Sequence, residues 1–310
     1  MQSNNLSIVS VNCQGLNNSQ KRRDVFHYLR NKKYSVYFLQ DTHFEKNMEK
    51  YISAEWGYQA CFSSYTSNSR GVAILFNNNF EFKLKRVIKD DLGNFIIALV
   101  EIQNSNFLFV NIYGPNRDDP EFYNNLKQNI NGFGVENVII AGDFNLVLDS
   151  VRDYHNYKHI NNPKAKEAVD DMIESLDLND IWRDINPECL RYTWRRTNPF
   201  QQARLDFFLI SDTVVSFVED VEIECGYRTD HSAVLLNLVF EKNIKRNTFW
   251  KFNSSLLKDK AYLDEINLEI KNITEEYAIN TNRPINDIPD EELQFSISDS
   301  IFLDFLLMKI

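Results

Sequence analysis

Apolar runs of strand length recur at short intervals through the first 240 residues, and few helical patterns separate them. The run 36–40 is almost continuously apolar, which is typical of a strand buried on both faces. This succession favours an α/β fold in which two mixed β-sheets pack face to face with helices outside. The expected strands are 6–12, 36–40, 58–62, 72–76, 80–88, 95–102, 107–113, 191–196, 204–210, 221–223 and 233–240.

Helical periodicity is found in a few segments. Asn18 or Ser19 is a typical N-cap for a helix that ends near residue 31, and further helices are expected at 120–130 and 163–176. After residue 240 the composition changes: 241–247 is polar like a linker, and 256–277 has the apolar spacing of an amphipathic helix. We therefore expect one domain over 1–240, followed over 241–310 by a linker and an amphipathic helical tail.

Composition limits the class of protein. The chain has 310 residues and a net charge of −10, which argues against a protein that coats nucleic acid through a basic surface. It does not exclude an enzyme on nucleic acid, because a carboxylate-rich metal site adds negative charge. The four cysteines lack metal-ligand spacing, residues 1–5 lack a signal-peptide pattern, and no apolar run approaches roughly 20 residues. We expect an intracellular monomer that is not bound to a membrane.

Three short acidic motifs adjoin apolar strand-like runs. They are Gly142-Asp143-Phe144-Asn145, Arg204-Leu205-Asp206 and Thr229-Asp230-His231-Ser232. A carboxylate at the end of a buried strand is costly unless something compensates its charge. Because a divalent cation and a phosphate ester would do so, the motifs point to metal-assisted cleavage of a phosphodiester.

Each motif residue has a candidate role in that chemistry. Asp143 could accept a proton, and Asn145, two residues on, could orient the attacking water or the phosphate. Asp206 lies in an apolar strand and needs a partner; His231 is suitable, because a carboxylate raises the pKa of an imidazole. A protonated His231 would stabilise a phosphate transition state, and Asp230 could reach a metal. Turn roles for Asp143 and Asn145, and a structural histidine, are the alternatives.

Three further residues stand at the ends of expected strands. Asp41 is the natural carboxylate ligand for Mg²⁺, which prefers oxygen donors, although it could instead cap a turn. Asn12 could bind a phosphate oxygen or a metal-bound carboxylate, or be a turn residue. Tyr113 could donate its hydroxyl to a phosphate oxygen, or simply pack against its neighbours.

Residues 192–202 have the pattern of a β-hairpin with a basic and aromatic tip. In this segment Thr193, Arg195 and Arg196, together with Arg204, are candidate DNA contacts, through phosphates or the minor groove. A solvated hairpin is the alternative. Arg70 is interpreted as an ordinary surface charge without a role.

Taken together, these residues resemble the endonuclease/exonuclease/phosphatase superfamily, and most closely the apurinic-like endonuclease domain of long interspersed (non-LTR) retrotransposons. The resemblance covers about residues 6–240. It is carried by Asn12, Gln40-Asp41-Thr42-His43, Asn111-Ile112-Tyr113, Gly142-Asp143-Phe144-Asn145, Thr193-Trp194, Arg204-Leu205-Asp206 and Thr229-Asp230-His231.

The resemblance implies a four-layer sandwich like deoxyribonuclease I and a nuclease that nicks double-stranded DNA. The cut would depend on Mg²⁺, or on Mn²⁺, and would leave a 3′-hydroxyl. In the family this end primes reverse transcription, so an active protein is expected in the nucleus. Asp41 would bind the metal with Asn12 and Asp230 nearby. Asp143 and Asn145 would position the water, while Tyr113 and His231 would bind the phosphate.

The sequence departs from the family pattern in ways that leave alternatives open. Family members most often have Glu where Asp41 stands, and Asp reaches about 1.3 Å less far. Gln14 stands where repair enzymes often have an acidic residue, and no Tyr-x-Asp-Asp polymerase motif follows, so we expect a truncated element without a reverse transcriptase. The alternatives are a weakened or inactive remnant, or another phosphodiesterase of the superfamily, such as an abasic-site repair endonuclease.

Overall fold

The computed structural model describes residues 5–157 and 162–240 and, beyond them, residues 260, 264, 267, 268 and 271. The chain divides into two units, Met1–Phe249 and Trp250–Ile310. The helix expected at 256–277 lies mostly outside the described residues, and the five described there are helical. Among the residues described, no helix is both long enough and apolar enough to cross a membrane.

The first sheet has six strands in the order β14-β15-β1-β2-β4-β3. Its only parallel pair is β1 with β2, and the other neighbours are antiparallel. The strands are β1 (Asn5–Asn12), β2 (Val36–Gln40), β3 (Ala60–Ser63), β4 (Val72–Phe76), β14 (Val218–Glu224) and β15 (Ala233–Val239).

The second sheet also has six strands, in the order β10-β13-β8-β7-β6-β5. Here β7 and β8 are the parallel pair, and the remaining neighbours are antiparallel. The strands are β5 (Lys83–Lys89), β6 (Phe95–Ile102), β7 (Ser105–Tyr113), β8 (Asn137–Asp143), β10 (Leu178–Asp180) and β13 (Asp206–Ser211).

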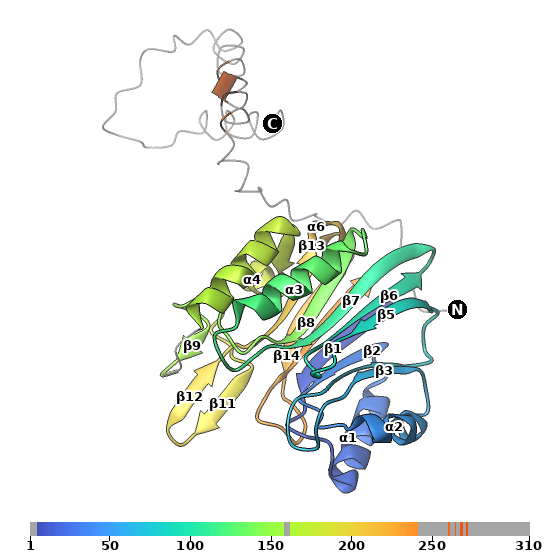
Figure 1. Cartoon of the computed structure of the whole chain (residues 1–310). Coiled ribbons are helices and arrows are strands. Elements are labelled where there is room, and N and C mark those ends of the chain that lie inside the picture. Colours follow the sequence, from blue (N-terminus) through green and yellow to red (C-terminus); the bar gives the residue numbers. More distant parts are fainter. Residues whose placement is uncertain are drawn as a thin grey trace. The chain divides into compact units, whose positions relative to one another are not determined.

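The two sheets pack face to face and helices cover their outer faces, so the predicted four-layer α/β sandwich is confirmed (Figure 1). In the core between the sheets, Phe38 of β2 packs edge to face against Phe109 of β7, with the ring centroids 5.9 Å apart. Alternate residues of the same strands face outward, as period-2 strands require. Tyr37 packs under α1 and α2 beside Trp56, whereas Val110 packs under α3 and α4.

The helices begin and end where the local sequence allows it. The side chain of Asn18 caps α1 by accepting a hydrogen bond from the backbone N–H of Lys21, and Asp119 caps α3 in the same way. Gly57 ends α2 in the left-handed conformation (φ +87°). The helices are α1 (Ser19–Lys32), η1 (Lys46–Met48), α2 (Glu49–Trp56), α3 (Pro120–Asn131), α4 (Pro163–Ser175), α5 (Ile181–Ile185) and α6 (Asp212–Val215).

A small third sheet projects beside the sandwich (Figure 1). It contains β9 (Tyr154–His155), β11 (Trp194–Thr197) and β12 (Phe200–Ala203), and the β11–β12 hairpin is the one that the sequence predicts. Expected strands at 58–62, 80–88 and 191–196 begin two or three residues later than predicted. The elements α2, α5, α6, β9 and β10 were not predicted.

Candidate active site

The topology brings the ends of strands from both sheets to one place. Asn12 ends β1 beside Gln40 at the end of β2, and Tyr113 ends β7 beside Asp143 at the end of β8. Asp206 begins β13, which runs antiparallel to β8, so it pairs with Asp143 at the same edge. Because both parallel pairs end at this edge, their polar side chains gather where the sheets meet.

A buried chain of side-chain contacts crosses between the sheets at this edge. The Asn12 Nδ2 donates to Asp143 Oδ2 at 2.9 Å, and His231 Nε2 lies 3.9 Å from the same oxygen. On its other side, His231 Nδ1 lies 2.8 Å from Asp206 Oδ2. All four side chains are buried, and the structure therefore brings together four residues that are up to 219 positions apart in sequence.

This chain of contacts sets the charges of its members. Burial lowers the pKa of His231, but the charge and hydrogen bond of Asp206, with smaller effects of Asp143 and Asp230, raise the pKa to about 9. Burial and the Asp206 carboxylate raise the pKa of Asp143, while His231 and the Asn12 amide oppose this rise. At neutral pH the site therefore holds an imidazolium between two carboxylates, one of which is close to its protonation equilibrium.

The backbone around Asp143 depends on glycine. Gly142 has φ +147°, and a Cβ there would collide with the carbonyl oxygen of Ile112 on the neighbouring strand. Beyond it, the Asn145 backbone N–H donates to Asp143 Oδ1 at 2.9 Å, and Asn145 Nδ2 donates to the Gly114 carbonyl at 2.7 Å. Asp143 is thus fixed by hydrogen bonds to both of its oxygens.

Tyr113 lies near both Asp41 and Asp143, whose charges act on its phenol. Burial, and then the charges of Asp41 and Asp143, raise the pKa of the Tyr113 phenol, so it remains a hydrogen-bond donor. Asn116 and Asn145 interact with its side chain. A donor in this position is suited to an oxygen of a phosphate ester.

Asp41 is held apart from the His231 cluster. Its Oδ1 accepts a hydrogen bond from the backbone N–H of Arg70 (3.1 Å) and lies 3.1 Å from His43 Nε2. Its side chain is 16% exposed, and Oδ2 has no such partner among the described residues. The predicted neighbours of Asp41 in a metal site make other contacts: Asn12 bonds Asp143, and the exposed Asp230 accepts from the Trp194 indole at 3.2 Å.

The described side chains offer one cluster of three potential metal ligands, namely Asp143, Asp206 and His231, whose ligand atoms lie within 4.8 Å of one another. A protonated imidazole cannot ligate a metal, and the raised pKa of His231 keeps it protonated. Asp41, with a free oxygen and partial exposure, fits the donor preference of Mg²⁺ better.

Comparison with known proteins identifies the family. The endonuclease/exonuclease/phosphatase family matches residues 9–231. The chain belongs to this family. It is also 28% identical over 270 residues, 84% of its length, to the uncharacterised 149 kDa protein of transposon TX1 from Xenopus laevis, of which it spans 20%. The resemblance stated from the motifs is thereby confirmed.

Solved structures share the fold of this family member. An AP endonuclease from Leishmania major has a TM-score of 0.66 at 15% identity, covering 76% of this chain and 88% of that one. An AP endonuclease from Archaeoglobus fulgidus has a TM-score of 0.61 at 19% identity, covering 74% and 98%. A 3′ phosphatase from Neisseria, bound to a product DNA hairpin, has a TM-score of 0.60 at 18% identity, covering 76% and 100%.

Two of the four predicted DNA contacts of this endonuclease/exonuclease/phosphatase protein are wrong. Arg204 is 1% exposed, and its guanidinium binds the carboxylates of Asp153 and Asp180 at 2.6 to 3.0 Å. Thr193 is fully buried, and its hydroxyl accepts hydrogen bonds from the backbone of Leu205 and Asp206. Both residues support the base of the hairpin and are inaccessible to DNA.

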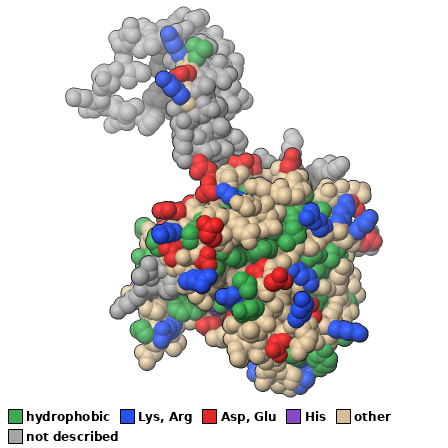
Figure 2. Space-filling model, in the orientation of Figure 1, with side chains coloured by type: hydrophobic (Ala, Val, Ile, Leu, Met, Phe, Trp, Pro, Cys, Tyr) green, Lys and Arg blue, Asp and Glu red, His purple; other side chains and the backbone are tan. Residues whose placement is uncertain are grey.

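Arg195 and Arg196 are exposed on the hairpin, as a DNA contact requires. The Arg195 guanidinium donates to the Ser232 hydroxyl at 3.1 Å, and its backbone N–H donates to the Asp230 carbonyl. The hairpin is therefore attached to the segment that carries His231. Over the face shown in Figure 2, acidic and basic side chains are interspersed among the described residues, so any basic DNA surface there is local.

The sequence interpretation gave no role to Arg70, nor to Asn111, although Asn111 belongs to one of the motifs. Asn111 bridges the sheets in the core: its Oδ1 accepts from Gln40 Nε2 at 2.7 Å, and its Nδ2 donates to the carbonyls of Leu39 and Ala73. Its amide side chain within an otherwise apolar strand was the feature of the sequence that could have indicated this buried role. Arg70 holds Asp41 through its backbone N–H, and the glycine that follows it, Gly71, was the only sign of this in the sequence.

Proposed function

We propose that this protein is a Mg²⁺-dependent endonuclease that nicks double-stranded DNA and leaves a 3′-hydroxyl. The observation that supports this most directly is the buried Asn12–Asp143–His231–Asp206 chain of contacts, with Tyr113 beside it and Asp41 close enough to affect the pKa of Tyr113. Such an arrangement supplies a proton acceptor, a fixed cation and a neutral donor to a phosphate that binds at this edge of the sheets.

Each of these residues has a role that follows from its contacts. Asp143, held by Asn12 and by the Asn145 backbone, accepts the proton of the attacking water. His231, kept protonated by Asp206, donates to a non-bridging phosphate oxygen and offsets the charge that develops there. Tyr113 donates to a second oxygen of the same phosphate.

Magnesium is the metal that the available oxygen donor fits. Asp41 Oδ2 would hold it, with substrate phosphate and water completing the shell, since Mg²⁺ usually takes one or two carboxylates from the protein. When bound, Mg²⁺ neutralises charge on the phosphate and on the leaving oxygen. Mn²⁺, which also accepts oxygen ligands, is expected to substitute.

The proposed reaction is a hydrolysis. The water oxygen forms a new bond to phosphorus and gives a proton to Asp143. The bond from phosphorus to the 3′-oxygen breaks, and the departing oxygen takes a proton from solvent. The products are a 3′-hydroxyl and a 5′-phosphate, and a DNA polymerase can extend the former without further processing.

The test is a nicking assay on supercoiled plasmid with mapped ends. The full chain is expected to relax the plasmid with Mg²⁺ and not with EDTA, and the nicks should be extendable by a polymerase. Asp143→Asn and His231→Gln should each lower the rate by about 10²-fold or more. Asp171→Asn, an exposed carboxylate on α4, is the matched control. Wild-type rates in either active-site variant would refute its role.

Two alternatives have specific outcomes in the same assay. The solved AP endonucleases favour a repair activity, which would show as preferential cutting of a duplex with one abasic site over an intact duplex. An inactive remnant would show no metal-dependent nicking in the wild type. The likeness to a transposon protein favours the intact duplex as substrate, and thus action in the nucleus.

A further inference from the structure

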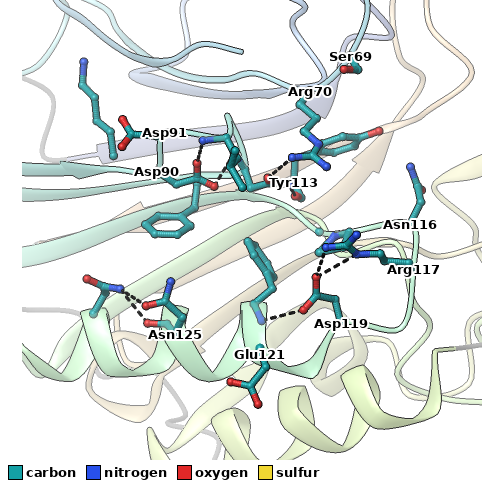
Figure 3. Close-up of a pocket in the computed structure, with 18 of the residues that line it drawn as sticks. Ser69, Arg70, Asp90, Asp91, Tyr113, Asn116, Arg117, Asp119, Glu121 and Asn125 are labelled. Carbon is teal, nitrogen blue, oxygen red and sulfur yellow. Dashed lines mark hydrogen bonds and ion pairs between the residues drawn. The ribbon is translucent and has the colours of Figure 1, made fainter. Parts of the chain in front are cut away.

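A cleft of about 890 Å³ opens beside Tyr113 (Figure 3). Its walls come from the segment before β4, which carries Ser69 and Arg70, from the β5–β6 turn, from the segment that joins β7 to α3, and from α3 itself. The volume lies within the range of about 300 to 1,000 Å³ that ligand pockets have. Because Tyr113 belongs both to the cleft and to the proposed phosphate site, a DNA strand bound at one extends toward the other.

We propose that Arg70 binds a backbone phosphate of DNA in this cleft, next to the phosphate that is cut. This inference deepens the proposed function and rests on it for the identity of the polyanion. Figure 3 shows Arg70 and Tyr113 together, with Asn116 and Arg117 toward the same end and Asp90 and Asp91 toward the other.

Arg70 is positioned before any ligand arrives. Its backbone is left-handed (φ +61°), and its N–H is bound to Asp41. Its guanidinium lies 5.0 Å from the centre of the Tyr65 ring and donates to Asn94 Oδ1 at 3.3 Å. Asn94 in turn donates to the Tyr113 carbonyl at 2.8 Å. Arg70 is therefore connected to both Asp41 and Tyr113, and little conformational entropy remains to be lost on binding.

The guanidinium of Arg70 still has unused donors. No carboxylate lies within 4.0 Å of it among the described residues, whereas Arg117 across the cleft is paired with Asp119 at 2.9 Å. Only one of its N–H groups has a hydrogen-bond partner there, and a guanidinium has five. A planar fork with free donors matches two oxygens of one phosphate.

The carboxylates of the cleft limit how far a polyanion can follow it. Asp90 is engaged by the backbone N–H groups of Leu92 and Asn94, and Asp119 by Arg117. Asp91 and Glu121 add further negative charge to the walls, with Lys89 as the remaining cation. Phosphate binding is therefore expected at the Arg70 end, where the cations and the Tyr113 donor lie.

The test measures binding without cleavage. The full chain in EDTA is titrated with a labelled intact duplex at several salt concentrations. Arg70→Gln is expected to weaken binding about tenfold at low salt and to reduce the slope of log K against log salt by about 0.9, the value for one phosphate contact. Arg70→Lys should keep most of the slope, and Lys32→Gln at the end of α1, which is not among the residues that line the cleft, should keep all of it.

Three outcomes separate this inference from the proposed function. If the wild type nicks DNA and Arg70→Gln has the same salt slope as the wild type, the Arg70 contact alone is overturned. If the wild type does not nick DNA but Arg70→Gln lowers the salt slope by about one, the contact is supported and the catalytic proposal is refuted. A loss confined to A·T-rich duplexes would place Arg70 in the minor groove and overturn phosphate binding. Thermal unfolding of each variant shows whether Arg70→Gln is folded.

Discussion

Asp206 is the residue whose replacement tests the site most sharply. Its Oδ2 lies 2.8 Å from His231 Nδ1, and it begins a strand that is buried throughout. Asp206→Asn keeps the size and a hydrogen-bond acceptor but removes the charge that favours the imidazolium. The buried Asp206 Oδ1 has no hydrogen-bond partner in the described structure, so the new amide displaces no existing contact of that atom.

The expected magnitude follows from the pKa of His231. Burial is the largest influence and lowers the pKa, and without Asp206 only Asp143 and Asp230 oppose it, so the pKa should fall well below 9. At pH 7.5 about 97% of wild-type His231 is protonated, and a fall to the ordinary imidazole pKa of about 6.5 would leave about 9% protonated. If the imidazolium carries the transition-state stabilisation, the rate falls about tenfold from this change alone.

The measurement has two independent arms. The chain contains five histidines, so an NMR titration assigned with His231→Gln reports the pKa of His231 directly. In single-turnover nicking, the wild type should gain activity as Asp143 loses its proton and lose activity as His231 deprotonates near pH 9. In Asp206→Asn the alkaline loss should move to lower pH, together with the pKa of His231 that the titration reports. An alkaline limb that stays near pH 9 would refute the reasoning.

Three further predictions concern other parts of the molecule. Asp41→Asn should raise the Mg²⁺ concentration for half-maximal nicking at least about tenfold, and calorimetric Mg²⁺ titration should show the same loss. Arg204→Met should lower the free energy of unfolding in urea by about 3 to 5 kcal/mol, because Asp153 keeps only part of its buried charge compensation. In the native protein a thiol reagent should modify the two exposed cysteines, Cys189 and Cys225, and spare the buried Cys13 and Cys61, whose pKa values burial raises.

The sandwich and its site were predictable because both depend on local patterns. Buried strands leave apolar runs, and a costly carboxylate at the end of such a run marks the edge where strands terminate. Asp143, Asp206 and His231 each carried that signal, and the structure joins them. The convergence itself follows from topology, since parallel strands that end at one edge bring their last residues together.

The predictions about Arg204 and Thr193 failed for a common reason. An arginine in a polar motif looks like a surface cation until its partners are known, and these come from Asp153 and Asp180, 51 and 24 residues earlier. A threonine in a hairpin likewise gives no sign that its hydroxyl caps the backbone of Leu205. Helix α2 was missed because its eight residues bury only Ile52 and Trp56, too few to establish a helical period.

Asp41 shows how metal binding and proton chemistry can be separated in this site. The His231 cluster balances its own charges, with one imidazolium between two carboxylates, whereas Asp41 bonds His43 and a backbone N–H and is not paired with a lysine or arginine side chain among the described residues. A metal cation is therefore stabilised most by binding at Asp41, whereas the protonation of His231 depends mainly on Asp206. It follows that Asp41→Asn should change the metal requirement while leaving the pKa of His231 near 9, and Asp206→Asn should do the reverse. If both variants moved the metal requirement and the pH profile together, the two functions would share one charged cluster, and the assignment of Asp41 as a distinct metal ligand would fail.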